Sequence, residues 1–564
     1  MASSIENFKK IKDIKKTVRT RFPWFWEQFI RYAWEARVKL PLLEPMLFSQ
    51  IRKVGKGLAS YRPESGGKKV LFFQTRSNAP HLSWAGTLAL ALSARGHQAK
   101  FFGCGGELFH ACNNANYPEG LSESRCRICY ISTRRFFELS GIETTWMSGY
   151  LDSSDIERAE NMVNTLKACE YESFEYRSYP LGQIARHSVA HFLRTGSIGD
   201  DSLSREVYRK FLINSILVAD ASIKLMDEYD PDVVLMLCGL FMPEHVMMDI
   251  ARSRGKRVVV YEIAMLAQDA LMMQHDRPID YDDRENWERF KSLPLTVEEN
   301  ATLDNYLFER SQGRMSVVNY WPEKEEDERN IRESLGINSD KRTAVLFPNI
   351  TWDSALFEKD IAFKGMFDWL DRTFDFFAAH PEYQLIVRAH PAEVILPGSL
   401  RESVISYITG KYPALPANII LVAPESKISS YSLMDMSHCG LSYASTTAIE
   451  LGIRGIPTLV AGEVHFRRKG FTIDIDDAST YHSLLDETMK GNASLSRAEI
   501  IEMARRYAYF TFYRTSMPFN KIHCGAGDQP VLTYDDISSL APGNDKSLDI
   551  ICSGIISGTP FIFE

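Results

Sequence analysis

The chain has 564 residues, of which 45% are hydrophobic and 24% charged, and its formal net charge is −8. This length exceeds what one hydrophobic core usually serves, so we expect a soluble protein with two domains. The sequence contains no run of about 18 apolar residues and no hydrophobic leader, which argues against a membrane span and against export. In a cytoplasmic protein, the nine scattered cysteines are expected to be reduced thiols.

The charge is unevenly distributed along the chain. Residues 1–62 contain 14 Lys or Arg against 5 Asp or Glu, so the remainder carries −17. An acidic body argues against nucleic-acid binding, which requires a basic surface. Apolar residues recur every three or four positions from Ile5 to Phe29, which predicts a basic amphipathic helix. Two interpretations stay open: peripheral contact with the inner face of a membrane, or a helical arm packed on the body.

Strand-like and helix-like segments alternate after this arm. The first series of apolar strand segments is 69–73, 99–103, 233–238 and 258–261, with helical segments at 82–95 and 243–253. A second series follows the acidic stretch 322–328, with strand segments at 344–347, 385–389, 419–422, 440–443 and 458–460. Such alternation is typical of parallel βαβ units. The sequence therefore predicts an α/β protein with two Rossmann-like doubly wound domains that face a cleft, preceded by a helical extension.

The expected boundaries follow from these two series. We expect a basic extension at 1–66, a first domain at 67–312, a second at 313–500 and a tail at 501–564 that partly packs back on the first domain. Ligands of open α/β sheets bind beyond the carboxyl ends of the strands. Polar residues that directly follow a predicted strand are therefore the candidates for a site.

The second domain ends one strand with Arg388-Ala389-His390-Pro391. An arginine offers a fork of N–H donors that matches phosphate oxygens, and a histidine adds a further donor. Proline makes the following turn rigid. We therefore predict a phosphate-binding site that includes Arg388 and His390. The other His-Pro pair, His380-Pro381, follows a predicted helix and is interpreted as a structural stop.

A second candidate segment follows the strand at 440–443. It contains small hydroxyl residues and then a predicted helix, in which Glu450 lies one turn from the start. Hydroxyl residues cap helices, and the N–H groups at the start of a helix favour phosphate. Helix capping alone is the alternative interpretation. Together with His390, the segment predicts a nucleotide site in which Glu450 accepts hydrogen bonds from ribose hydroxyls. The candidate donor-binding residues are Arg388, His390, Ser442, Ser445, Thr446, Thr447 and Glu450.

These motifs resemble those of GT-B glycosyltransferases. The His390-Pro391 pair, the hydroxyl-rich loop with Glu450 and the Gly455-Ile456-Pro457 turn are similar to the bacterial capsule polysaccharide biosynthesis family, which includes Kdo transferases. The His-Pro and serine motifs also resemble those of bacterial sialyltransferases and teichoic-acid glycerophosphotransferases, where they hold the nucleotide phosphate of the donor. The likeness extends to the segment 281–313 and to Pro348-Asn349-Ile350-Thr351-Trp352-Asp353, and it covers the first domain only loosely.

The resemblance implies that the first domain presents the acceptor. Asn78, Asn349 and Asp353 are expected to contact the acceptor or to lie in the cleft. Inverting transfer needs a base that removes the proton of the attacking hydroxyl. His81, in the loop after the first strand, is one candidate, since imidazole titrates near neutral pH. Glu262, at the end of the strand 258–261, is the other. A loop histidine that caps a helix is the alternative interpretation of His81.

No cofactor and no catalytic metal are expected. The Asp474-Ile475-Asp476 pattern lies past the nucleotide loop, and GT-B enzymes generally work without a catalytic metal. Cys104, Cys112, Cys126 and Cys129 form the densest cysteine group and include a two-residue spacing found in zinc sites. However, the first spacing is seven residues. A structural metal site is therefore one interpretation, and ordinary reduced cysteines are the favoured one.

The predicted function is transfer of a sugar from a nucleotide-activated donor to a bacterial surface polysaccharide or a lipid-linked glycan. The His-Pro pair favours a cytidine nucleotide, so that a CMP-sugar is the expected donor. Three alternatives remain open on the same fold: a nucleotide-sugar epimerase, a polyol-phosphate transferase and a non-catalytic nucleotide-sugar-binding subunit of a glycan assembly complex. Two candidate bases argue against the non-catalytic alternative.

Overall fold

The computed structural model describes most of the chain. The described residues are 28, 30–36, 45–58, 67–109, 111–112, 123–264, 270–281, 284–312, 324–353, 356–395, 401–523 and 530–564. Apart from Gln28, the predicted basic helix between Ile5 and Phe29 lies outside them. In the described part of the chain, no helix is both long and apolar enough to cross a membrane.

The first unit is built on a seven-stranded sheet with the order β13-β6-β5-β4-β1-β2-β3. Strands β1 to β5 run parallel to one another, whereas β6 is antiparallel to both of its neighbours, β5 and β13. Its strands are β1 (Lys69–Gln74), β2 (Gln98–Gly103), β3 (Glu143–Trp146), β4 (Val233–Leu237), β5 (Arg257–Ile263), β6 (Ala270–His275) and β13 (Ser516–Pro518). The helices around it are α3 (Met46–Leu58), α4 (Ala79–Ser93), α5 (Glu123–Ser140), α6 (Ser153–Asn164), α7 (Leu181–Leu193), α8 (Ser202–Tyr229), α9 (Met242–Ser253) and α20 (Lys546–Ser557).

The second unit repeats this strand order. Its six-stranded sheet runs β12-β11-β10-β7-β8-β9, and all its strands are parallel. The strands are β7 (Arg342–Phe347), β8 (Tyr383–Arg388), β9 (Ile419–Val422), β10 (Cys439–Ser442), β11 (Thr458–Val460) and β12 (Ile473–Asp474). Its helices are α12 (Glu328–Leu335), α13 (Met366–Ala379), α14 (Ala392–Ile395), α15 (Val404–Lys411), α16 (Ser430–Asp435), α17 (Thr447–Ile453) and α18 (Tyr481–Lys490).

Continuous apolar runs explain the central strands of both sheets. All six residues of β8 and all five of β4 are buried, because helices cover both faces of a parallel sheet. In each sheet the chain builds three strands outward in one direction and then returns to the other side of the first strand. The doubly wound α/β fold predicted from the sequence is therefore confirmed in both units.

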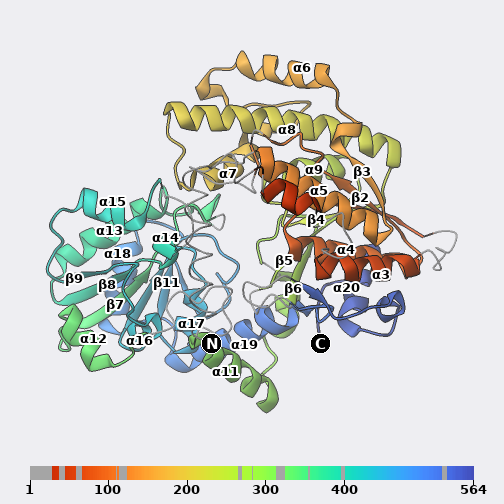
Figure 1. The fold of residues 1–564 in the computed structure, drawn as a ribbon. Coiled ribbons are helices and arrows are strands. Elements are labelled where there is room, and N and C mark those ends of the chain that lie inside the picture. The colour runs from red at the N-terminus through yellow and green to blue at the C-terminus, as the bar shows by residue number, and fades with distance from the viewer. Residues whose placement is uncertain are drawn as a thin grey trace, which may run out of the picture.

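The chain crosses between the units twice. The first crossing contains α10 (Arg284–Phe290) and α11 (Val297–Ser311), and the second contains α19 (Arg497–Tyr509) followed by a π-helical turn, Phe510–Arg514. Figure 1 shows α11 and α19 beside each other between the two units. The chain then adds β13 to the edge of the first sheet and continues through the small hairpin of β14 (Ile522–His523) and β15 (Val531–Leu532) to α20.

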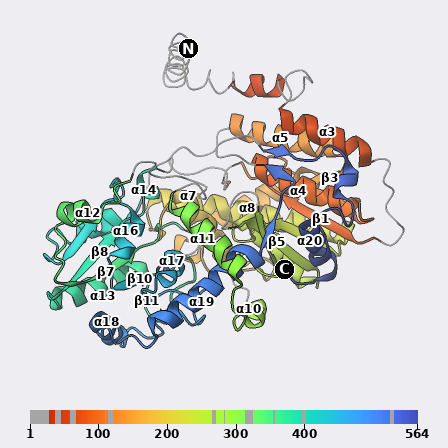
Figure 2. The ribbon, with the colours of Figure 1, turned by 90° about the horizontal axis from the view of Figure 1, so that it is seen from below.

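The segments at the two ends of the described chain pack on the first unit. Helix α3 buries Leu47, Phe48, Ile51 and Val54 in the same core as β1 and α20. Its Gly55 lies so close to α5 that an added Cβ would stand 2.2 Å from the carbonyl oxygen of Leu139. Figure 2 shows α3 and α5 side by side, with α20 on the same unit. The residues after α19 thus return to the first unit.

Candidate functional site in the cleft between the two units

The carboxyl ends of the strands of the two sheets face each other. Trp352 and Asp353, in the loop after β7, lie against the first unit: the Trp352 ring is 5.7 Å from the ring of His191, and the Asp353 charge acts on Tyr281. A cavity of about 390 Å³ opens between the units, and residues of both line it, among them Arg186, Ser197, Thr351 and Tyr443. The positions where the strand order reverses, between β1 and β4 and between β7 and β10, are thus on the cleft side.

His390 lies two residues after Arg388, the last residue of β8, and is half-buried. Its Nδ1 accepts a hydrogen bond from the backbone N–H of Ala392 at 3.1 Å, so the neutral ring carries its proton on Nε2. Burial, and then the charge of Arg388, lower the pKa of His390 to about 4. The ring is therefore neutral at pH 7, and it can offer a phosphate a neutral N–H donor rather than a charge.

Arg388 is buried at the end of β8 and holds a loop in place. Its Nη1 donates to the carbonyl oxygen of Ala423 at 2.6 Å, and its Nη2 donates to that of Ser426 at 2.9 Å. Burial lowers its pKa to about 10, so the group is still charged at pH 7. These donors point at the loop after β9. The structure therefore gives Arg388 a supporting role beside His390, and its predicted contact with phosphate stays a prediction.

The loop after β10 is a compact hydroxyl-rich turn. The Ser442 Oγ accepts from the backbone N–H of Ser445 and donates to its carbonyl oxygen, both at 3.1 Å. Asn349, from the loop after β7, accepts from the backbone N–H of Ala444 at 3.0 Å, which ties the two central loops together. Thr447 donates to Ser445 Oγ at 3.0 Å. Helix α17 has only seven residues, and Thr446 does not cap it with its side chain.

Glu450 is buried in the first turn of α17 and is paired with an arginine. Its Oε1 accepts from the Nε of Arg310 at 2.9 Å, and Arg310 also donates to the hydroxyl of Tyr306 at 3.1 Å. Burial acts to lower the pKa of Arg310, but the Glu450 charge raises it above its ordinary value. The predicted ribose contact of Glu450 stays a prediction, because the side chain orients Arg310 in this structure.

The first unit carries a similar pair at its own reversal point. Arg76 follows β1, and its Nη2 donates to Oε2 of Glu244 at 3.1 Å. The hydroxyl of Thr75 donates to Oε1 of the same carboxylate at 2.9 Å. Glu244, only 1% exposed, lies in the first turn of α9, directly after β4. Neither Arg76 nor Glu244 was selected from the sequence, although Arg76 follows a buried strand as Arg388 does.

Glu262 ends the cleft side of β5 and is half-buried. Its Oε1 accepts the backbone N–H of Ile263 at 2.9 Å. Burial raises the pKa of this carboxyl above its ordinary value, with Arg76 opposing and Glu244 reinforcing the effect. Tyr281, whose hydroxyl donates to the carbonyl oxygen of Ile263 at 3.4 Å, feels the charges of both Glu262 and Asp353. Glu262 is therefore a carboxyl group whose proton affinity is adjusted by the cleft.

His81 lies in the first turn of α4, on the same side of the first sheet as Arg76. Burial, and then the Arg76 charge, lower its pKa to about 3. Its ring packs 5.4 Å from that of Trp84. Asn78, at the start of the same helix, is exposed and makes no capping hydrogen bond with its side chain. A histidine with so low a pKa is a poor base at neutral pH, whereas burial raises the pKa of Glu262. Which of the two acts as the base stays a prediction.

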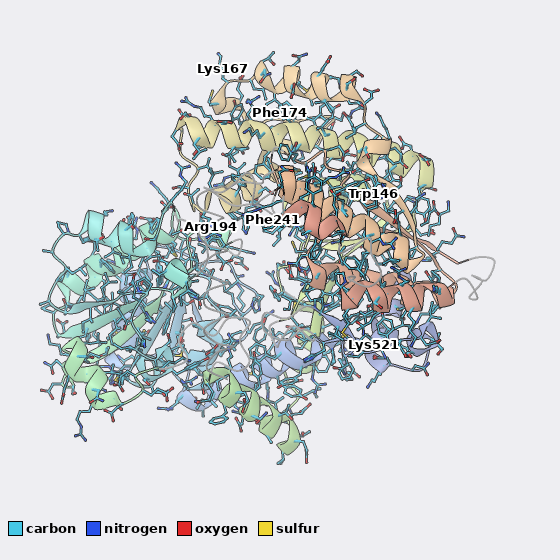
Figure 3. All side chains as sticks on the ribbon, in the orientation of Figure 1. Trp146, Lys167, Phe174, Arg194, Phe241 and Lys521 are labelled. Carbon is cyan, nitrogen blue, oxygen red and sulfur yellow. The ribbon has the colours of Figure 1, made fainter. Side chains whose placement is uncertain are left out.

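One face of α7 makes the contact with the loop after β7. His187, His191 and Arg194 are spaced four and three residues apart, which places them on one side of the helix. The Arg194 guanidinium lies 5.3 Å from the ring centre of Trp352, and the ring of His187 lies 4.8 Å from that of Phe357. Figure 3 places Arg194 and Phe241 at the side of the first unit that faces the second. The sequence analysis did not select this face.

Residues 401 and 402 of the second unit close the same side of the cleft. Glu402 accepts from the backbone N–H of Gly196 at 3.0 Å and from the hydroxyl of Ser197 at 3.1 Å. Arg401 pairs with Asp201, the residue that caps α8, at 2.8 Å. We call these two residues the clasp. The clasp lies at α7 and the start of α8, whereas the two chain crossings lie at α11 and α19 (Figure 1).

The four clustered cysteines all lie in the described part of the chain. Among the described residues, no three or more Cys, His, Asp or Glu side chains are placed to hold a metal ion. None of the four is joined in a disulfide there, and burial raises the pKa of Cys104 well above its ordinary value. The choice between a structural metal site and ordinary reduced cysteines stays a prediction.

Two doubly wound units whose strand ends face each other across a cleft define a GT-B architecture. No family model and no curated protein sequence matches the chain. The chain is similar in structure to "Thermosulfurimonas dismutans KpsC, beta Kdo 2,4 transferase", with 14% identity over 55% of this chain and 87% of that one, at a TM-score of 0.35.

Two further similar structures have different activities. One is a UDP-GlcNAc 2-epimerase from Neisseria meningitidis bound to UDP-GlcNAc, with 12% identity over 78% of this chain and 99% of that one, at a TM-score of 0.24. The other is the glycotransferase of kitacinnamycin, with 13% identity over 80% of this chain and 97% of that one, at a TM-score of 0.25. Likenesses this distant leave the reaction type open.

Proposed function

We propose that the protein is a glycosyltransferase that moves a sugar from a nucleotide-activated donor to a glycan acceptor. The observation that carries this proposal is the pairing of two unlike sites across one cleft. The second unit offers neutral donors and hydroxyl groups near His390 and Ser445, whereas the first offers Glu262, a carboxyl group with a raised pKa. The donors and hydroxyl groups of the second unit suit a nucleoside diphosphate or monophosphate. The carboxyl group of Glu262 in the first unit suits an attacking hydroxyl.

The second unit would hold the nucleotide of the donor. His390 donates through Nε2 to a phosphate oxygen, and the loop of Ser442 to Thr447 supplies hydroxyl groups, braced by Asn349. Arg310, held by Glu450 and Tyr306, adds a positive charge at the helix that follows this loop. These donors would stabilise the negative charge that develops on the leaving phosphate. A CMP-sugar is the donor that the His-Pro motif favours.

The first unit would bind the acceptor and activate it. Glu262 removes the proton of the acceptor hydroxyl as that oxygen attacks the anomeric carbon, and the bond to the phosphate oxygen breaks. Tyr281 lies near both this carboxyl group and Asp353, and Tyr281 and Asp353 would contact the acceptor. The acceptor we propose is a bacterial surface polysaccharide or a lipid-linked glycan, with the basic segment 1–62 at the inner membrane surface.

A thermal-shift panel of CMP, CDP, UDP, GDP and ADP tests the donor site. Free ligand at about 100 times its dissociation constant stabilises a protein by roughly 2.7 kcal/mol, which is readily measured as a rise in Tm. We expect one nucleotide to raise the Tm of the wild type and His390→Ala to remove most of that rise. The nucleotide that acts would name the donor class.

The other His-Pro pair, His380-Pro381, provides a matched control. His380 ends α13, and its ring Nδ1 lies 2.9 Å from Oε1 of Glu382 rather than in the cleft. His380→Ala should therefore leave the nucleotide shift unchanged. If no nucleotide shifts the folded wild type, or if both histidine variants lose the shift equally, the proposed donor site is wrong.

An epimerase is the second candidate, and one observation favours it. Glu244 lies near enough to Glu262 for their charges to interact, which provides the paired carboxylates that such a reaction needs. However, Thr75 and Arg76 already bind both oxygens of Glu244. Incubation of the nucleotide sugar in deuterated water without an acceptor separates the candidates. An epimerase would exchange a carbon-bound proton of the sugar for deuterium, whereas a transferase would leave that proton in place.

A further inference from the structure

Arg76 is held rigidly at the reversal point of the first sheet. Its Nη2 is bound to Glu244, whose other oxygen accepts from Thr75, and its backbone carbonyl oxygen accepts from the side chain of Gln74 at 2.8 Å. Its guanidinium lies 5.1 Å from the ring centre of Phe241. A guanidinium fixed by a buried carboxylate, a hydroxyl and an aromatic ring is a preorganised binding group rather than a flexible surface side chain.

Only one edge of this guanidinium is used. Among the described residues, Nη2 is the only nitrogen of Arg76 with a hydrogen bond, so Nε and Nη1 keep their N–H groups available. The side chain is 11% exposed, so these donors are largely shielded from bulk solvent. An arginine with a free, shielded N–H edge matches the two oxygens of a carboxylate or a phosphate.

Four ring nitrogens near Arg76 have no hydrogen-bond partner in the described part of the chain. His81 Nδ1, Trp84 Nε1, His191 Nδ1 and Trp352 Nε1 are all buried and make no hydrogen bond. The Arg76 charge acts on both histidines, and the rings of His191 and Trp352 are in contact across the cleft. Buried polar atoms are nearly always paired in folded proteins. Four such atoms beside an arginine with a free N–H edge indicate a polar ligand that would form the missing hydrogen bonds.

The two carboxylates near Arg76, those of Glu244 and Glu262, do not bind its free N–H edge. Glu244 is saturated by Arg76 and Thr75, and Glu262 accepts from the backbone of its own strand. The free edge of Arg76 thus has no carboxylate partner in the described part of the first unit.

We propose that Arg76 binds an oxyanion, either a carboxylate or a phosphate, carried by the acceptor sugar. The proposal rests on the proposed function, in which the first unit holds the acceptor, and it narrows the acceptor to an acidic or phosphorylated glycan. Glu244 is then a positioning residue, because it acts on the substrate only through Arg76. The two rings that face each other across the cleft, His191 and Trp352, border the same ligand.

Ligand-observed NMR titrations with three simple sugars test the site on the full chain. The probes are glucuronate, glucose 6-phosphate and neutral glucose, each measured with the wild type. We expect one charged sugar or both to bind at least about tenfold more tightly than glucose, as a charge-assisted pair of hydrogen bonds should provide. The glucuronate and glucose 6-phosphate arms distinguish a carboxylate from a phosphate.

Three variants connect the binding to Arg76. Arg76→Gln should remove the preference for the charged sugar. Because that change leaves Glu244 buried and unpaired, the double variant Arg76→Gln/Glu244→Gln provides a neutral pair that still lacks the site. Arg254→Gln, which loses an ion pair with Asp227 at the far end of α9, is the matched control and should bind as the wild type does.

The outcomes separate this inference from the proposed function. Equal binding of charged and neutral sugars by the wild type, or retention of the preference in a folded Arg76 variant, would overturn the oxyanion site. Arg76-dependent binding together with a nucleotide panel that shows no shift would retain the site and reject the transferase. A nucleotide shift without any charge preference would reject the site alone.

Discussion

At the scale of single residues, the two units share one pairing of charged side chains. In each unit, a buried glutamate in the first turn of the helix after the fourth strand holds an arginine: Glu244 holds Arg76, and Glu450 holds Arg310. A carboxylate that is saturated by such a pair is unavailable for proton transfer. Glu262 forms no such pair in the described part of the chain, which supports its proposed role as the base.

Kinetics of two variants test this assignment. Glu262→Gln should lower kcat by about 10²–10⁴-fold, the usual contribution of a general base, while nucleotide binding is kept. His81→Asn should have a much smaller effect, because a histidine with a pKa of about 3 is already deprotonated and weakly basic at pH 7. The wild-type rate should rise with pH along an acid limb whose midpoint lies above the ordinary pKa of glutamate. A larger loss in His81→Asn than in Glu262→Gln would reverse the roles.

At the scale of elements, the clasp and the histidine face of α7 determine how the cleft is closed. The clasp binds the backbone and side chains of residues 196–201, which connect α7 to α8. The loop after β7 meets α7 directly, through Trp352 and Phe357. The loop after β7 carries Asn349 and Asp353, so its contact with α7 helps to position these two candidate residues at the cleft.

Hydrogen exchange measured by mass spectrometry tests the clasp. Glu402→Ala removes the acceptor for the N–H of Gly196, so peptides that cover residues 194–201 should exchange faster, by about tenfold or more for that amide. Glu382→Ala, at an exposed position where the carboxylate contacts His380, is the matched control and should leave these peptides unchanged. Unchanged exchange in Glu402→Ala would mean that the clasp is not formed in solution.

At the scale of the whole molecule, buried histidines make stability depend on pH. Burial lowers the pKa of His191 and His245 to about 4, against about 6.5 in an unfolded chain. The unfolded state therefore binds more protons between these values, and the free energy of unfolding rises with pH. The contribution of these two histidines to the free energy of unfolding is complete above pH 6.5. It is lost as the pH falls towards 4.

Thermal unfolding between pH 7 and pH 4.5 checks this expectation. The Tm of the wild type should fall over that interval, and the fall should be smaller in His191→Gln, which lacks one of the groups that must be protonated. His523→Gln changes an exposed histidine and should follow the wild-type slope. An identical slope in all three proteins would show that His191 does not contribute to the loss of stability.

The fold was largely predictable, because it depends on local patterns. Buried runs such as Val70–Phe73 and Leu385–Val387 are long enough to identify parallel strands from the sequence. The long helix α8 was not predicted, because 17 of its 28 residues are buried and its sequence lacks a clear polar face. The expected domain boundaries stay predictions.

The site was less predictable, because it depends on which loops meet. Polar residues at strand ends pointed to Arg388, His390 and Glu262, and the same reasoning applied to Thr75-Arg76 would have found the first unit's arginine. The pattern of residues did not show that Arg388 turns towards the loop after β9 or that Glu450 is paired with Arg310. The sequence did not reveal the α7 face, because His187, His191 and Arg194 contact a loop that belongs to the other unit.

The return of the chain to its first sheet limits how this protein can be divided. Strand β13 covers the edge of β6, and its Pro518 lacks the N–H that would extend the sheet further. A chain ended before residue 516 would expose that edge as a template for pairing with other chains, so the first half is expected to aggregate when produced alone. The first unit is therefore not a single continuous stretch of sequence, whereas the second lies between the two crossings. Exchange of the second unit between proteins of this fold would need two junctions, one in each crossing. A chimera with a single junction would instead combine β1 to β6 of one protein with β13 and α20 of the other.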